Sequence, residues 1–223
     1  KVKGYLEEAR LYKLSRRVLV EMPFARHTRR HVRTIPVGFD PELYATVGKT
    51  RWNPYTDEPI QNAAALIYVL RRVANTGPER LTKLKELHDE HPKLIVFYNF
   101  TYELEALRGF LSEHNLTYAE WNGQKHQDIP DTDSWIYLVQ DTSGSDAWNC
   151  IETDTMLFYS LQYSYRTFEQ CQGRIDRLNT LFSELWYYVF RSNSLIDQAI
   201  WRAIQKKENF NERIFSKANH IEF

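Results

Sequence analysis

The segment EQCQGRIDRL, residues 169–178, carries the side chains whose types and spacing are best suited to chemistry. Gln170, Arg174 and Arg177 are separated by four and three positions, so a helix would place all three on one stripe. An arginine stays charged, and its planar guanidinium matches the oxygens of a phosphate group. The stripe therefore predicts either a contact to phosphate or an ordinary solvated helix face, and the surrounding elements must decide between the two.

Five short apolar runs predict the strands that would position this segment. They are KLIVFYNF (93–100), LTYAEWNG (116–123), SWIYLVQ (134–140), TMLFYS (155–160) and LWYYVF (185–190). Helical periodicity marks residues 62–75, 81–91, 101–115 and 194–207, together with the segment that carries residues 169–178. Continuous apolar runs are typical of strands buried in a parallel sheet. The alternation predicts an α/β fold, a parallel sheet flanked by helices.

The first part of the chain has a different composition. Residues 1–35 are rich in arginine, most densely between Arg26 and Arg33, and we interpret them either as a solvated basic segment or as a phosphate contact. Residues 36–60 hold several prolines and predict a loop with a short helix. We expect residues 1–91 to form a basic lead-in and helical segment that packs on a lobe of residues 92–223, as one structural unit.

The overall composition excludes several classes of protein. Lys+Arg and Asp+Glu are both 29, so the formal net charge is zero and any site for a polyanion must be a local patch. The 2 cysteines are too few for a disulfide scaffold or a cysteine zinc cluster. Neither a signal peptide nor a run of membrane-spanning length is evident. We expect a cytoplasmic protein without a membrane partner, and a chain that is a piece of a longer one because it begins at Lys1.

Three segments resemble ligand motifs only superficially. GKT at Gly48–Thr50 lacks the glycine that a phosphate-binding loop needs five positions earlier. HDEH at His88–His91 has the wrong histidine spacing for a zinc helix. The acidic run Asp128–Asp133 has turn-forming composition, and we interpret it as a solvated loop. No metal ligands are predicted, although a metal-dependent nuclease that uses these aspartates remains an alternative.

Parallel sheets bind ligands at the carboxyl ends of their strands, where short polar side chains and backbone amides suit phosphate. Tyr98, Asn99 and Phe100 close the first predicted strand, and Asn122 and Gly123 close the second. The segment DTSGSDAWN, residues 141–149, follows the third. These residues are therefore candidates for binding.

The segments VQDTSGSDAWN and EQCQGRIDRL, in this order, resemble motifs V and VI of superfamily-two helicases, closest to the Swi/Snf-type translocases and their phage-encoded relatives. Motif VI has the form Q-x-x-G-R-x-x-R, and Gln170, Gly173, Arg174 and Arg177 match every fixed position. Motif V resembles G-G-x-G-x-N. Here Gly144 and Asn149 match it, whereas Ser145 and Ala147 replace glycines. The segments around KLIVFYNF, LSRRVLVEMPF, IPVGFDPELY and LWYYVF also resemble the family, so the similarity spans nearly the whole chain.

The resemblance implies the second of two RecA-like lobes. The first lobe of the family carries the phosphate-binding loop and the acidic pair that holds magnesium, and this chain has neither. ATP and Mg²⁺ would therefore be bound mainly by an N-terminal RecA-like lobe, and this chain alone would not hydrolyse ATP. By resemblance, Arg177 is the principal arginine finger and Arg174 a second phosphate contact. Gln170 would orient within the nucleotide cleft, Asn149 would reach the ribose, and Gly173 would let its helix pack closely on the sheet.

The resemblance also implies a face for DNA, held through its backbone without sequence preference. Its candidate residues are Tyr98, Asn99, Phe100, Asn122, Gly123, Ser143 and Gly144. Binding of this kind is salt-sensitive, and a chain of zero net charge should bind weakly on its own. A phage-encoded protein of this family would act in the host cytoplasm.

Each assignment has a structural alternative. Gln170 could form a capping box with Thr167, and Arg174 and Asp176 could belong to surface ion pairs. Gly144 could serve a turn, Trp148 could pack in the core, and Cys171 could be a small buried filler. The main alternative function is a stand-alone RecA-like module that binds nucleic acid or docks a partner without ATPase activity.

Overall fold

The computed structural model describes residues 7, 9–10, 13–14, 27–144 and 149–219, and these form a 6-stranded parallel sheet in the order β1-β8-β7-β4-β6-β5. The strands are β1 (Arg29–Pro36), β4 (Lys93–Tyr98), β5 (Tyr118–Trp121), β6 (Trp135–Gln140), β7 (Thr155–Phe158) and β8 (Glu184–Arg191). The five predicted strands are confirmed with shifted ends. So is the RecA-like α/β fold.

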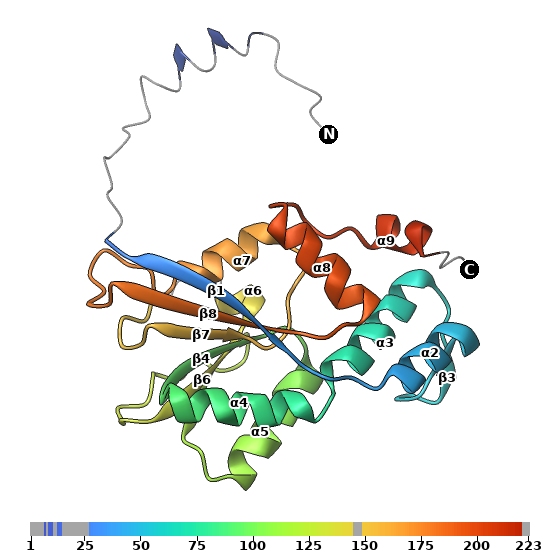
Figure 1. Ribbon diagram of the computed structural model, residues 1–223, viewed down its shortest axis with the longest axis horizontal. Coiled ribbons are helices and arrows are strands. Elements are labelled where there is room, and N and C mark those ends of the chain that lie inside the picture. Colours follow the sequence, from blue (N-terminus) through green and yellow to red (C-terminus); the bar gives the residue numbers. More distant parts are fainter. Residues whose placement is uncertain (1–6, 8, 11–12, 15–26, 145–148, 220–223) are drawn as a thin grey trace.

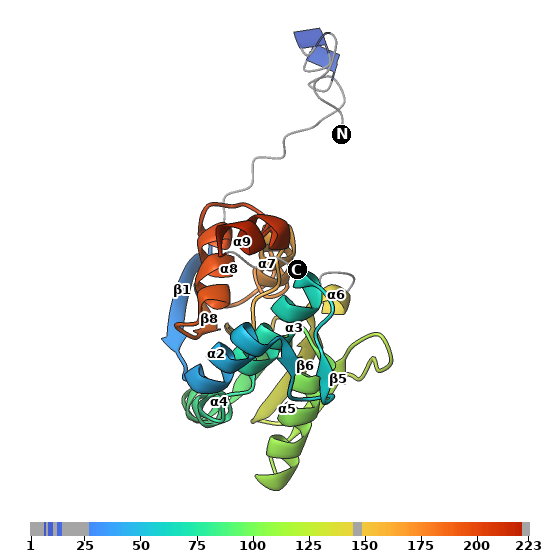
Figure 2. The same cartoon turned by 90° about the vertical axis from the view of Figure 1, so that its right-hand side faces the viewer.

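Helices cover both faces of the sheet. Those predicted from periodicity are α3 (Ala63–Asn75), α4 (Glu79–Glu90), α5 (Thr101–Glu113), α7 (Tyr165–Gln172) and α8 (Leu195–Gln205). The short helix predicted within residues 36–60 is α2 (Pro41–Thr50). The structure adds α6 (Asp141–Gly144), α9 (Glu212–Ala218) and a hairpin of β2 (Trp52–Asn53) and β3 (Glu58–Pro59). Figures 1 and 2 place α7 and α8 on one side of the sheet and α4 and α5 on the other.

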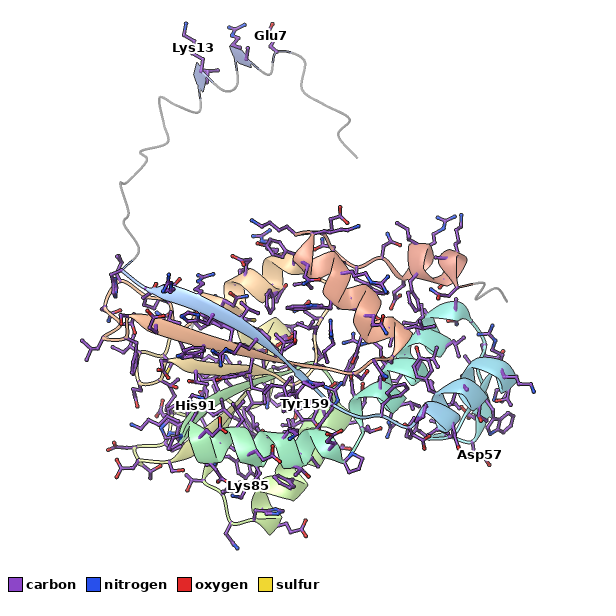
Figure 3. All side chains as sticks on the ribbon, in the orientation of Figure 1. Glu7, Lys13, Asp57, Lys85, His91 and Tyr159 are labelled. Carbon is purple, nitrogen blue, oxygen red and sulfur yellow. The ribbon has the colours of Figure 1, made fainter. Side chains whose placement is uncertain are left out.

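The central strands explain why the sequence shows continuous apolar runs. Along β4, Ile95 and Phe97 belong to the core shared with α3, α7 and α8, whereas Leu94 and Val96 belong to the core shared with α4 and α5. All four side chains are fully buried, because successive residues of a strand point to opposite faces and both faces are covered. Figure 3 shows the side chains that fill the space between the layers.

The strand β1 corrects the interpretation of the arginine-rich segment. Residues 29–36 are not a solvated basic segment but an edge strand, paired in parallel with β8 from Arg29 opposite Glu184 to Pro36 opposite Arg191. Two of its basic side chains pack on one aromatic ring. The guanidinium of Arg33 lies 4.4 Å from the ring centroid of Trp186, and the ring of His31 stacks on Trp186 at 4.3 Å. Arg26 lies outside the described residues.

The pairing of β1 with β8 joins the lead-in to the lobe in one sheet. The division at residue 91 stays a prediction. Gly48–Thr50 form the last turn of α2, where no strand-to-helix turn exists for a phosphate-binding loop, in agreement with the sequence analysis.

Two helices begin with different caps. Ser194 caps α8, because its hydroxyl accepts a hydrogen bond from the backbone N–H of Asp197 at 3.3 Å. The cap of α5 is Phe100, whose side chain cannot accept such a bond. Glu103 closes this turn instead, by accepting from the backbone N–H of Phe100 at 3.3 Å.

Candidate functional site

The start of α7 rules out one alternative for Gln170. Ser164 caps this helix, since its hydroxyl accepts a hydrogen bond from the backbone N–H of Thr167 at 3.2 Å. The capping box of Thr167 with Gln170 is therefore wrong. Gln170 is half-buried, and its side-chain amide makes no hydrogen bond to any other residue that the structure describes.

The end of α7 changes the geometry expected for the two arginines. The helix ends at Gln172 with Gly173 as its C-cap, so Arg174 and Arg177 lie in the loop that follows and do not share a helical stripe with Gln170. Among the described residues, a Cβ on Gly173 would meet only carbonyl oxygens of its own helix, that of Gln170 at 3.3 Å first. The close packing of this helix on the sheet, which the resemblance assigns to Gly173, stays a prediction.

The loop that carries the arginines lies against the end of the motif V segment. The carbonyl oxygen of Arg174 accepts a hydrogen bond from the backbone N–H of Cys150 at 3.0 Å. Asn149 is the neighbour of Cys150 and is exposed. The residue after Asn149 is thus in backbone contact with Arg174, and the role of Asn149 at the ribose stays a prediction. Residues 145–148, which include Ser145, Ala147 and Trp148, lie outside the described residues, so the interpretation of Trp148 as a core residue stays a prediction.

The electrostatics of Arg177 combine partial burial with a neighbouring like charge. Its side chain is half-buried, and among the described residues its Nε has no hydrogen-bond partner. Burial lowers the pKa of the Arg177 guanidinium below its ordinary value, the charge of Arg174 lowers it further, and Asp176 offsets part of this. Two like charges that are held together in this way would be stabilised by a bound anion.

The loop after α7 that carries Arg174 and Arg177, called the arginine loop from here on, does not lie at the carboxyl edge of the sheet. Asp176, between the two arginines, bonds Thr28 at 2.6 Å and Arg30 at 2.6 Å, which lie at the beginning of β1. The chain enters α7 after the carboxyl end of β7 and leaves it near the amino end of β1. The side chain of Asp176 is only 6% exposed, so it does not belong to a solvated surface ion pair.

The carboxyl edge carries the residues predicted to contact DNA, and two of them are buried. Tyr98 is 1% exposed and lies in the core beside α5. Asn122 is 5% exposed, and its side-chain oxygen accepts hydrogen bonds from the backbone N–H groups of Gln124 at 2.9 Å and Lys125 at 3.0 Å. Neither side chain is on the surface. Gly123, next to Asn122, is exposed.

Asn99 and Phe100 also lie at this edge. The side-chain amide of Asn99 donates to the backbone carbonyl of Ser160 at 3.0 Å, which ties the carboxyl ends of β4 and β7 together. The ring of Phe100 stacks on that of Tyr102, with centroids 5.0 Å apart. The guanidinium of Arg71 lies 4.8 Å from the ring centroid of Phe100. Ser143 is half-buried in α6, and Gly144 ends that helix. Figure 1 labels α6.

Comparisons with known proteins find similarity to helicases and chromatin-remodelling ATPases. Helicase SWR1 from Candida glabrata is 24% identical over 143 residues, 60% of this chain and 10% of that protein. Chromatin-remodeling ATPase INO80 from Emericella nidulans is 23% identical over 172 residues, 70% of this chain and 11% of that protein. The crystal structure of the C-terminal part of the Fun30 ATPase domain matches with a TM-score of 0.54 at 12% identity, over 82% of this chain and 74% of that one. No model of a protein family matches the chain.

This chain resembles the C-terminal lobe of a Swi/Snf-type helicase. It spans about a tenth of the length of the curated relatives it matches. The relatives named here are fungal, and the phage origin stays a prediction.

The Swi/Snf-like lobe contains a buried carboxylate that sequence reasoning missed as part of the site. Glu103 accepts hydrogen bonds from the hydroxyl of Ser160 at 3.0 Å, the side-chain amide of Asn75 at 2.8 Å and the backbone N–H of Asn99 at 2.8 Å. Burial raises the pKa of Glu103, and these bonds and Arg71 offset part of the rise. Glu103 lies in the first turn of α5, where an acidic side chain can accept hydrogen bonds from backbone N–H groups. This position was the signal in the sequence that could have revealed it.

Two further findings concern membrane spans and metal ligands. Across residues 27–144 and 149–219, no helix combines the length and the apolar character needed to cross a membrane. In the same part of the chain no three His, Cys, Asp or Glu side chains gather into a possible metal site, and Asp128, Asp131 and Asp133 are exposed.

Proposed function

We propose that this chain is the second motor lobe of an ATP-dependent DNA helicase or translocase, and that Arg174 and Arg177 act on ATP held by a separate first lobe. The similarity to a helicase and to a chromatin-remodelling ATPase supports the class of the whole protein. The order and fixed positions of the motif VI residues support the assignment of the arginines.

The observation that carries the proposal is the state of Arg177. Its guanidinium is half-buried beside a like charge, and among the described residues its Nε has no hydrogen-bond partner. A transferring phosphoryl group spreads negative charge over its oxygens, and a guanidinium placed against them accelerates transfer by about 10³–10⁵. Arg177 is therefore the principal finger, and Arg174 is the second contact.

Other residues of the site would contribute to nucleotide binding. The half-buried Gln170 and the exposed Asn149 lie on the two segments that the Cys150–Arg174 hydrogen bond joins, so both can approach the same nucleotide. ATP and Mg²⁺ would be held mainly by the first lobe. The Swi/Snf-like lobe alone should not hydrolyse ATP.

DNA would contact the carboxyl edge of the sheet. Of the candidates, Gly123 is exposed, and Asn99, Phe100 and Ser143 are half-buried; Gly144 ends α6 beside them. Short polar groups and backbone amides at this edge suit the sugar–phosphate backbone. Binding should be independent of sequence and should weaken as salt rises.

The experiment replaces Arg177 in the two-lobed protein that contains this chain. Arg177→Ala should lower DNA-stimulated ATP turnover by about 10³-fold or more, while nucleotide binding stays nearly unchanged. The matched control is Arg166→Ala, because Arg166 is exposed on α7. Unchanged turnover in Arg177→Ala would overturn the proposal, and DNA binding without any ATPase activity would favour the stand-alone module.

A further inference from the structure

A carboxylate between the two arginines fastens their loop to the beginning of β1. The Oδ1 atom of Asp176 accepts a hydrogen bond from the hydroxyl of Thr28 at 2.6 Å, across 148 positions of sequence. The Oδ2 atom accepts from Nε of Arg30 at 2.7 Å and pairs with its Nη2 at 2.6 Å. Both carboxylate oxygens of Asp176 are thus engaged by β1 and the residue just before it.

Arg30 also reaches the last turn of α7. Its Nη1 lies 3.5 Å from the side-chain oxygen of Gln172 and 3.6 Å from the carboxylate of Glu169. The ring of Tyr187 lies 6.0 Å below the guanidinium and donates its hydroxyl to the backbone carbonyl of Gln172 at 3.0 Å. One guanidinium, 18% exposed, therefore connects the end of α7 with the arginine loop.

The pairing matters because of where Asp176 lies in the sequence. A carboxylate one residue from Arg177 and two from Arg174 would compete with phosphate for either guanidinium, since opposite charges at contact distance neutralise each other. Bonding by Arg30 and Thr28 restrains this competitor. The pKa of Arg177 agrees, because the effect of Asp176 on it is smaller than those of burial and of Arg174.

We propose that Arg30 is a positioning residue for the arginine loop: it fixes the loop through Asp176 and keeps that carboxylate from neutralising Arg174 and Arg177. This inference rests on the proposed function. Arg30 itself touches no substrate. Charge-assisted hydrogen bonds in a forked geometry restrict both distance and angle, which suits a loop that must present two guanidinium groups to one ligand.

The first experiment measures ATP turnover in the two-lobed protein. Arg30→Gln should lower kcat about tenfold with little change in the KM for ATP, because the first lobe holds the nucleotide. Arg30→Lys keeps the positive charge but loses the planar guanidinium that donates two hydrogen bonds at once. Its kcat should lie between those of Arg30→Gln and the unchanged protein. Arg33→Gln is the matched control, since Arg33 lies on the same strand but packs over Trp186.

The second experiment separates positioning from general damage to the fold. In Arg30→Gln, the released carboxylate of Asp176 can pair with the arginines, so adding Asp176→Asn should recover part of the lost turnover. Because Arg30 and Asp176 are in contact, a structural role alone would couple the two sites in the free energy of unfolding, measured by urea denaturation, but would not restore turnover in the folded protein. Circular dichroism verifies folding; if Arg30→Gln does not fold, the comparison is made with Arg30→Lys, with and without Asp176→Asn.

The outcomes distinguish this inference from the proposed function. If Arg177→Ala abolishes turnover but Arg30→Gln matches Arg33→Gln, or if Asp176→Asn rescues nothing, then Arg30 has no positioning role and the proposed function stands. If Arg177→Ala leaves turnover unchanged, the proposed function fails, and the role of Arg30 fails with it.

Discussion

The guanidinium of Arg80, at the start of α4, donates a hydrogen bond to the carboxylate of Asp197, in the first turn of α8, at 3.1 Å. Arg80 is fully buried, and it also donates to the backbone carbonyls of Ala74 at 3.3 Å and of Tyr159. Because α4 and α8 lie on opposite faces of the sheet (Figure 1), this pair links the two helical layers beyond the carboxyl ends of the strands.

Removal of Arg80 should be strongly destabilising. Arg80→Met leaves the carboxylate of Asp197 without its cationic partner, and breaking a buried pair costs about 3–5 kcal/mol in the free energy of unfolding. Urea denaturation measures this. Lys85→Met is the control on the same helix (Figure 3), where an exposed pair with Asp89 at 2.6 Å should contribute about 0.5 kcal/mol or less. Equal losses in both variants would contradict the prediction.

Replacing two glycines by alanine should change the free energy of unfolding in opposite directions. A Cβ on Gly77, between α3 and α4, would lie 2.4 Å from the backbone carbonyl oxygen of Gly38. Gly77→Ala should therefore force the backbone apart and destabilise the chain. Gly109 is exposed within α5, and a Cβ there meets nothing within 4 Å. Gly109→Ala should stabilise by about 0.4–1 kcal/mol in urea denaturation. A stabilising Gly77→Ala would show that the loop moves without cost.

The buried carboxyl of Asp141 should make stability depend on pH. Burial raises its pKa well above the ordinary value, and the charge of Glu103 raises it further. Between pH 3.8 and the raised pKa, the Asp141 carboxyl is therefore protonated in the folded chain and ionised in the unfolded chain. In that window the free energy of unfolding falls as pH rises.

Asp141→Asn removes this titration, so the decline in stability with pH should become shallower. Urea denaturation at a series of pH values from about 4 to about 8 measures the slope. Asp128→Asn, at an exposed position of a loop, should leave the slope as it is. An Asp141→Asn slope equal to that of the unchanged chain would rule out Asp141 as its source.

The sequence predicts the central sheet well because burial on both faces leaves a clear signal. The run LIVFY, residues 94–98, is apolar at every position since Ile95 and Leu94 face different cores. The edge strand β1 has no such run. Its Arg33 packs over Trp186, and a cation on an aromatic ring is indistinguishable in sequence from a solvated charge.

The candidate site was harder to predict because its geometry depends on where a helix ends. The residue types of Gln170, Arg174 and Arg177 suggested a stripe, yet α7 ends at Gln172 with Gly173 as its C-cap. A glycine at this place is a helix stop signal, but the resemblance assigned it to packing on the sheet. The role of Arg30 was hidden for a different reason. Its partner Asp176 is 146 positions away, and contacts between distant segments follow from the strand order, which periodicity does not reveal.

That strand order also constrains how the lobe is made in the cell. β1 pairs only with β8 among the strands of the sheet, and Arg29 lies opposite Glu184. During synthesis, the arginine-rich strand leaves the ribosome long before its neighbour exists, and contacts of such high sequence separation form late and slowly. The central strands can assemble first, and the docking of β1 completes the sheet. The hydrogen bonds of Asp176 to Thr28 and Arg30 can form only when that last step has taken place.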